Sequence, residues 1–251
     1  MMTGSALGAR VRDELHDAAL DGGVTLFGSG MNPGFLDAVA AVAAGASLGV
    51  RHVRASESVD VSLYAGDANF DAFGWGSSPT REGLAADVEA ATAVFAEGLD
   101  VLARILGVAA HEPRCTVEVA VATRDLDLPG RPIAEGTLAG IDLRWEALRD
   151  GVPVIELHQR WVMGSAIEPP WPVDHGWSIT VTGDPRIHIK LDVWPDTDDL
   201  ASLGATDLHD IGMRLTGVPL VNAIPHVCAA PAGIRTYADL PLVSGNLGAG
   251  R

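Results

Sequence analysis

The sequence is poor in cysteine, with only Cys115 and Cys228 among its 251 residues. Two cysteines without a CxxC pair or a Cys/His cluster exclude a framework of disulfides and a structural zinc site, and the eight histidines show no HxxxH spacing. Residues 1–20 lack the apolar core of a signal peptide, and residues 35–50, the most apolar stretch, are too short to span a bilayer. We therefore expect a cytoplasmic protein with no metal site.

Basic residues are also scarce, with 17 Lys and Arg against 33 Asp and Glu, which gives a formal net charge of −16. Nucleic acids and anionic membranes are bound through Lys and Arg, so neither is expected as a partner. Hydrophobic residues make up 47% of the chain. That proportion is ample for a buried core in one large domain or two small ones.

Helical periodicity predicts three helices in the first half of the chain, over residues 7–20, 33–47 and 80–106. Asn32 is predicted to cap the second of them, with Pro33 at its first position. Short strands are predicted over residues 24–27 and 50–62. Residues 66–78 are glycine-rich and irregular, and we interpret them as a loop or lid on the substrate side.

The second half changes to the two-residue period of strands. Asp150-Gly151 and Gly183-Asp184 lie where hairpin turns are expected, and such short connections predict an antiparallel meander. Two helices and an extended tail complete the chain. The predicted strands lie near residues 116–122, 136–148, 152–164, 177–182 and 186–194, the helices over residues 206–215 and 220–228, and the tail over residues 230–243.

A glycine loop, Gly28-Ser29-Gly30 followed by Gly34, lies between the first strand and the second helix, and Glu57 ends the next strand. This order looks like a dinucleotide-binding fingerprint, in which glycines admit a pyrophosphate and an acidic residue holds a ribose. A Rossmann domain needs further βα repeats, however. The loop therefore has three readings: a compact Rossmann protein, a glycine-rich turn before a buried helix, and the family resemblance that follows.

Residues 26–35 resemble the crossover of the 2,4-diaminopentanoate dehydrogenase family, in which a Gly-x-Asn-Pro-Gly-Phe turn leads from the cofactor domain into the catalytic domain. Residues 221–225, 229–234 and 239–241 look like the carboxyl end of the same family. The two matches occur in the same order and bracket nearly the whole chain. Dihydrodipicolinate reductases belong to the same superfamily, but their His-His-x-x-x-Lys motif is absent from residues 54–60.

The resemblance implies an α+β fold: a mixed, mainly antiparallel sheet with flanking helices, preceded by a remnant helix and strand of a Rossmann domain. Residues 1–27 would be that remnant, and residues 28–251 the dihydrodipicolinate-reductase-like C-terminal domain. It also implies an NAD(P)-dependent oxidoreductase that transfers hydride on a small amino-substituted substrate. Superfamily members assemble through the sheet, so a homo-oligomer with tryptophans at the interface is expected.

Under this reading the backbone of the crossover touches the cofactor, which makes Gly28, Ser29, Gly30 and Asn32 the candidate NAD(P)-binding residues. The catalytic candidates are Glu57, which with Asp60 could bind an ammonium group or exchange a proton, and His158, with His188, as proton donor. The structural alternatives are that Glu57 and Asp60 are ordinary surface carboxylates, and that His158 and His188 lie on a solvated face of the sheet. A non-catalytic oligomerisation or small-ligand-binding module remains the alternative function.

Overall fold

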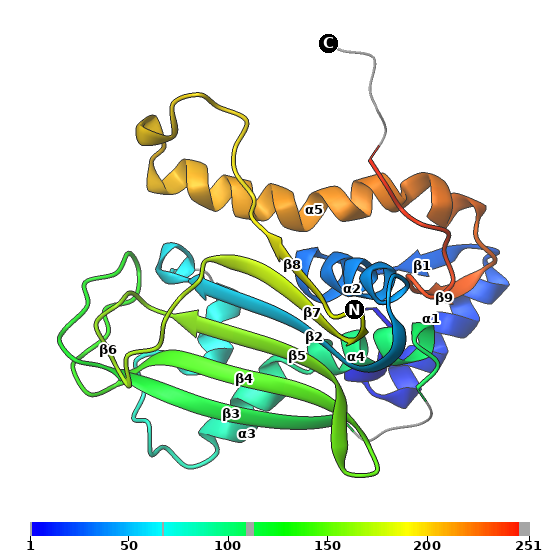
Figure 1. Ribbon diagram of the computed structural model, residues 1–251. Coiled ribbons are helices and arrows are strands. Elements are labelled where there is room, and N and C mark those ends of the chain that lie inside the picture. The colour runs from blue at the N-terminus through cyan, green and yellow to red at the C-terminus, as the bar shows by residue number, and fades with distance from the viewer. Residues whose placement is uncertain (1, 67, 109–112, 246–251) are drawn as a thin grey trace.

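The computed structural model describes residues 2–66, 68–108 and 113–245. They form an α+β fold with an open sheet of seven strands, mostly antiparallel, and a separate small parallel sheet, as predicted (Figure 1). The seven strands lie in the order β6-β3-β4-β5-β2-β7-β8. Their bounds are β2 Leu48–Asp60, β3 Pro113–Ala122, β4 Leu138–Arg149, β5 Val152–Val162, β6 Ile167–Glu168, β7 Gly176–Asp184 and β8 Ile187–Leu191.

The sheet departs from the predicted simple meander at its centre. Strand β2 lies between β5 and β7, parallel to β5 and antiparallel to β7. The chain from β5 to β7 includes β6 and passes across β2, so β5 and β7 are separated in the sheet by β2. Since β3, β4 and β5 pair antiparallel, as do β7 and β8, the reading as a compact Rossmann protein is wrong.

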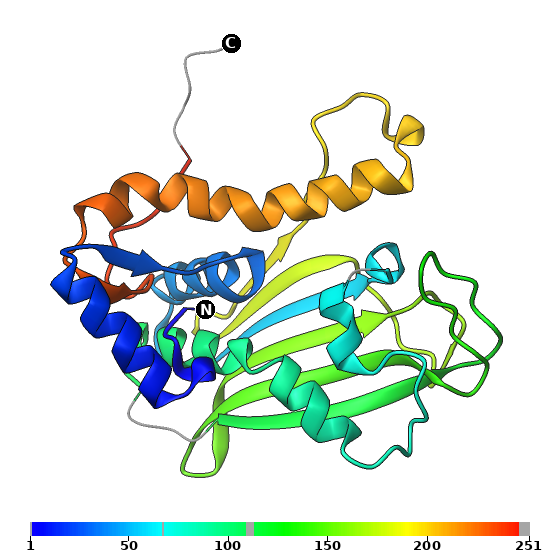
Figure 2. The same ribbon diagram turned by 180° about the vertical axis from the view of Figure 1, so that it is seen from behind.

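Helices α2 (Leu36–Ala44), α3 (Leu84–Ala91) and α4 (Val94–Ile105) cover one face of the sheet, and Figure 2 shows α3 and α4 in front of it. The core lies between these layers and includes Ala55 and Leu157, which are at most 1% exposed. The single helix predicted over residues 80–106 is instead two. The chain bends at Thr92, whose hydroxyl donates to the Val88 carbonyl and accepts from the Trp145 indole.

The two ends of the chain meet in a second, smaller layer. Strand β1 (Thr25–Phe27) pairs in parallel with β9 (Gly233–Arg235), and α1 (Ala9–Asp21) packs against both. The N-terminal segment is held by Glu97 of α4, whose carboxylate accepts hydrogen bonds from the backbone amides of Met2, Thr3 and Ala6. The start of the described chain is therefore docked on helix α4.

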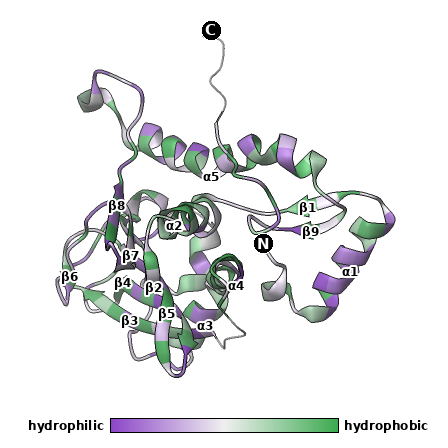
Figure 3. Ribbon diagram, turned by 45° about the vertical axis from the view of Figure 1, so that its right-hand side comes forward, coloured by the Kyte–Doolittle hydropathy of each residue, from purple (hydrophilic) through white to green (hydrophobic). Residues whose placement is uncertain are grey.

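Helix α5 (Ala205–Ala229) crosses the top of the molecule in one piece, although two helices were predicted there. Pro219 and Pro225 lie inside it, and each removes one backbone donor. Pro225 is exposed, so water can satisfy the carbonyl that it frees, whereas Pro219 is buried, and the helix continues through both. Both α1 and α5 mix hydrophilic and hydrophobic residues along their length (Figure 3), and no described helix is long and apolar enough to cross a membrane.

The tryptophans of the sheet are placed differently from one another. Trp145 and Trp161 are buried within the chain, at 5% and 8% exposure, on the face that the helices cover. Trp194 is 72% exposed, beyond the end of β8. Burial inside a single chain thus accounts for Trp145 and Trp161 without a subunit interface.

Candidate functional site

The crossover loop between β1 and α2 is tightly packed by the chain's own residues. Gly28 and Ser29 are half-buried, and Gly30 is buried. The Ser29 hydroxyl lies 2.9 Å from the hydroxyl of Tyr237, and Gly30 lies against Thr216 of α5. The loop is therefore fixed from the carboxyl-terminal side of the chain, by residues far away in the sequence.

Asn32 does not cap a helix, contrary to prediction. It and Pro33 are extended, with φ/ψ of −148/116 and −77/159, and α2 begins only at Leu36. No side chain among the described residues caps α2; instead Asp37, in its first turn, accepts at Oδ2 a hydrogen bond of 2.8 Å from the Gly34 amide of the preceding turn. The Asn32 side chain is engaged elsewhere: its Nδ2 donates to Glu57 Oε2 at 2.8 Å.

Glu57 is the centre of the candidate site. It lies near the end of β2, on the face shared with the buried Val53 and Ala55, and is itself half-buried. Besides Asn32, two indoles donate to its carboxylate: Trp161 Nε1 to Oε1 at 2.8 Å and Trp177 Nε1 to Oε2 at 2.9 Å. The three donors come from the crossover loop, β5 and β7, so the sheet and the loop together fix the direction of the carboxylate.

The three donors of Glu57 are neutral. In the part of the chain that the structure describes, no Lys, Arg or His forms an ion pair with it, and the nearby Arg54 pairs with Glu156 on the opposite face of the sheet. Hydrogen bonds from neutral groups stabilise a carboxylate without cancelling its charge. Glu57 is thus a partly buried carboxylate with no cationic partner among the described residues, a setting that favours binding of a cation.

Aromatic rings pack around Trp161, one of the two indole donors of Glu57. The ring of Phe73 meets that of Trp161 edge-on, with centroids 5.3 Å apart, and the centroid of Phe95 lies 6.1 Å from that of Trp161. Phe73 belongs to the segment interpreted as a lid, which therefore supports a residue that holds Glu57. A cation bound at Glu57 would carry its organic part against apolar surface.

Two polar side chains beside Glu57 have unused hydrogen-bonding capacity. Gln159 is paired with Glu57 in the parallel ladder between β2 and β5, is fully buried, and its side-chain oxygen and nitrogen have no partner among the described residues. The Oδ1 atom of Asn32 is likewise buried without a described partner. Buried amides are normally hydrogen-bonded, and exceptions are typical of sites that receive a further group.

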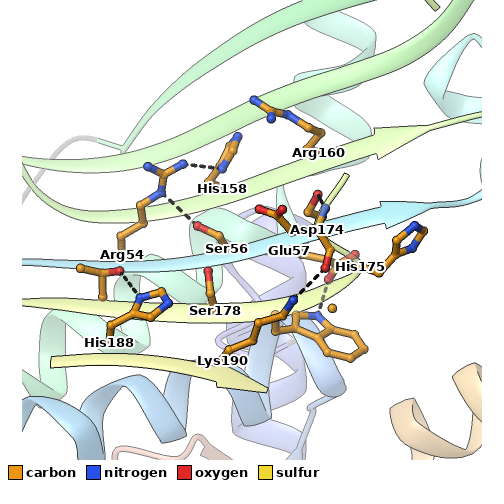
Figure 4. A pocket seen from close by; sticks show the side chains of 14 residues that line it. Arg54, Ser56, Glu57, His158, Arg160, Asp174, His175, Ser178, His188 and Lys190 are labelled. Atoms are coloured by element: carbon orange, nitrogen blue, oxygen red, sulfur yellow. Dashed lines mark hydrogen bonds between the residues drawn. The ribbon is translucent and has the colours of Figure 1, made fainter. Parts of the chain in front are cut away.

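His158 lies on the opposite face of the sheet from Glu57. Its neighbours in the ladder are Ser56 and Arg144, and it lines a polar pocket of about 480 Å³, which Figure 4 shows with His188 and Lys190 at its far side. Glu57 and Trp177 also line this pocket, so the two catalytic candidates border one pocket although their side chains leave opposite faces of the sheet. Asp60 is engaged away from Glu57: its carboxylate accepts hydrogen bonds from the backbone amides of Ser62 and Gly164.

His158 is held between a carboxylate and a guanidinium. Its Nε2 lies 2.9 Å from both oxygens of Asp142, and its Nδ1 lies 2.6 Å from Arg54 Nη2. These contacts fix the direction of the ring. Burial raises the pKa of Asp142, but the hydrogen bonds from His158 and Arg160 and the charge of Arg144 outweigh it and hold that pKa below its usual value.

Sequence reasoning missed most partners of Glu57. It identified Asn32 and Glu57, which the structure joins, but not the roles of Trp161, Trp177 and Gln159. One signal was present in the sequence. Gln159 is two positions from both Leu157 and Trp161, so it shares their face and is a polar residue on the apolar face of its strand.

The fold and the site together define an α+β domain with a half-buried carboxylate beside a glycine-containing crossover. The chain belongs to the family of 2,4-diaminopentanoate dehydrogenase C-terminal domains, whose sequence model matches residues 35–251. This membership confirms the resemblance drawn from the crossover turn and the carboxyl end.

Two similar proteins are amine dehydrogenases by name. The chain is 27% identical over 244 residues to an amine dehydrogenase of Streptomyces virginiae, a match that covers 92% of this chain and 64% of that protein. The structure of an amine dehydrogenase from Mycobacterium smegmatis matches with a TM-score of 0.72 and 20% identity, over 94% of this chain and 64% of that one. The chain thus spans just under two thirds of the length of each.

Proposed function

We propose that this chain is the catalytic domain of an NAD(P)-dependent oxidoreductase that acts on amines. In the overall reaction an organic ammonium, oxidised nicotinamide and water give a carbonyl compound, ammonium, reduced nicotinamide and a proton. The observation that carries the proposal is the Glu57 carboxylate, which three neutral donors hold in place and no described cation neutralises. Substrate and product of this reaction are both ammonium ions, which such a carboxylate binds.

Glu57 has two tasks in this account. Its negative charge attracts the substrate ammonium, and its oxygens accept one of the ammonium protons, because the lone pair of the free amine is needed to expel hydride from carbon. The indoles of Trp161 and Trp177 keep the carboxylate pointing in one direction while the proton moves. The indole of Trp161, against which Phe73 packs, offers apolar surface to the carbon skeleton.

The nicotinamide, when bound, accepts the hydride. The crossover residues Gly28, Ser29, Gly30 and Asn32 would hold it next to Glu57. The unused polar atoms of Asn32 and Gln159 fit this assignment, since a carboxamide has both donors and an acceptor to offer them. The names of the family and of the two similar amine dehydrogenases support an amine as the substrate class.

The experiment is an initial-rate assay of amine oxidation with NAD⁺ and with NADP⁺, followed by the appearance of reduced nicotinamide. We expect turnover in the wild type and a loss of about 10²- to 10⁴-fold in Glu57→Gln, which removes the proton acceptor but keeps the shape. Glu14→Gln, on the exposed surface of α1, is the matched control and should keep full activity.

Direct titration of the chain with NADH and NADPH separates this function from a non-catalytic module. Saturable binding of either cofactor supports the oxidoreductase. A folded chain that binds neither cofactor, and shows no amine oxidation, would leave the module as the better account.

A further inference from the structure

Asp37 is a buried acid that the proposed chemistry leaves unused. It is 0% exposed, in the first turn of α2. Its Oδ2 accepts the Gly34 amide at 2.8 Å, whereas its Oδ1 is buried without a partner among the described residues. A buried carboxyl group without a cation is costly to ionise, so a role for it in the native structure is expected.

The geometry around Asp37 concerns the crossover turn. Gly34 has φ of +130° and ψ of −87°, and a Cβ there would lie 2.5 Å from the Ser29 hydroxyl, so only glycine fits the turn. The Gly34 amide is buried and points at Asp37. Without this acceptor the turn would lose the side-chain hydrogen bond that holds it against α2.

Gly98 of helix α4 leaves room for Asp37 and the turn. A Cβ on Gly98 would lie 2.9 Å from Asp37 Oδ2 and 3.0 Å from Pro33 Cβ. The absence of a side chain at Gly98 therefore lets the acid and the turn pack together against the helix. Two residues before Gly34, the Asn32 amide reaches Glu57.

We propose that Asp37 is a positioning residue for the Glu57 site: its carboxyl group holds the turn over residues 32–34 from inside, and the turn presents the Asn32 amide to Glu57. Any effect on catalysis rests on the proposed function. The geometry itself can be measured without substrate or cofactor.

The surroundings of Asp37 favour its neutral form. Asp37 and Leu157 of β5 both lie next to Gly98 of α4, the buried Glu97 precedes Gly98 in the chain, and Tyr237 of the carboxyl-terminal segment interacts with Asp37 electrostatically. Burial raises the pKa of Asp37 from 3.8 to about 7, and the hydrogen bond from Gly34 lowers it only in part. A protonated carboxyl still accepts through one oxygen, so the turn is held on both sides of this pKa.

The test uses the ¹H–¹⁵N NMR signals of the Trp161 and Trp177 indoles and of the Asn32 side-chain amide in the free chain. We expect Asp37→Ala to shift or broaden all three signals, because the Gly34 amide loses its acceptor. Asp37→Asn keeps an acceptor and should leave them in place. Asp87→Asn is the control, since Asp87 also lies in the first turn of its helix, α3, but is exposed, and it should change none of them.

Gly98→Ala gives a second, independent perturbation that leaves Asp37 in place. Its added Cβ should displace the turn and change the same three signals as Asp37→Ala. If Asp37→Ala does not fold, Gly98→Ala and Asp37→Asn together still test the proposal. Unchanged signals in a folded Asp37→Ala variant would overturn the proposal, as would equal disturbance by Asp37→Asn. The NMR signals do not depend on turnover, so an absence of amine oxidation would not affect this test.

Discussion

Replacing Asp37 by asparagine should remove a specific pH dependence of stability. In the folded chain the carboxyl keeps its proton up to a pKa of about 7, whereas in the unfolded chain it ionises near 3.8. Between these values the folded state binds more protons than the unfolded state, so this group's contribution to stability falls as the pH rises. Above pH 7 both states are ionised, and the contribution no longer changes.

The magnitude follows from the separation of the two pKa values. A separation of about three units corresponds to roughly 4 kcal/mol, at ~1.4 kcal/mol for each unit. Between about pH 5 and pH 8, the contribution of Asp37 to the free energy of unfolding therefore falls by roughly 3 kcal/mol. Asparagine is isosteric, keeps an acceptor for the Gly34 amide and does not titrate. The free energy of unfolding of Asp37→Asn should therefore rise by this amount relative to the wild type over that interval.

Urea unfolding of both proteins, followed by circular dichroism at a series of pH values, measures this difference. All other titrating groups are shared, so their contributions cancel when one curve is subtracted from the other. A difference that stays constant from about pH 5 to pH 8 would refute the reasoning, because it would mean that Asp37 ionises alike in the folded and unfolded chains.

Three further substitutions test other contacts. Trp177→Phe removes one indole donor from Glu57 but keeps a ring, and should lower kcat/KM for amine oxidation about tenfold, or ~1.4 kcal/mol, with little change in urea stability. His158→Ala leaves Asp142 and Arg54 without a shared partner and should destabilise the fold by about 1–3 kcal/mol in urea unfolding, while amine oxidation per folded molecule falls far less than in Glu57→Gln. Glu97→Leu removes the acceptor of three N-terminal amides, and limited proteolysis should then cut residues 2–8 faster than in the wild type.

The sequence predicted the fold class and most elements because they rest on local patterns. Alternation identified the polar and apolar faces of β5, and Asp150-Gly151 adopts positive φ at both residues of the expected hairpin turn. The place of β2 between β5 and β7 could not be predicted in this way. Pairing between strands far apart in the chain is decided by packing against the helices, which local periodicity does not record.

The candidate site was predictable only in part, for a similar reason. The sequence singled out Glu57 and Asn32, but it assigned Asn32 to a helix cap on the strength of the Asn-Pro pair. In the fold, a carboxylate 25 positions later in the chain attracts the Asn32 amide away from the backbone. The two indoles reach Glu57 from more than 100 positions away. His158 was selected for its residue type, and only the ladder register shows that it lies on the other face.

The most direct test of the central claim is calorimetric titration of the chain with a simple alkylammonium ion, butylammonium, in wild type, Glu57→Gln and Glu14→Gln. If Glu57 is the ammonium-binding group, butylammonium should bind saturably to the wild type and the Glu14 variant. Its affinity should fall at least tenfold in Glu57→Gln, a loss of about 1.4 kcal/mol or more. Equal affinity in all three proteins, or no saturable binding to the wild type, would contradict the account.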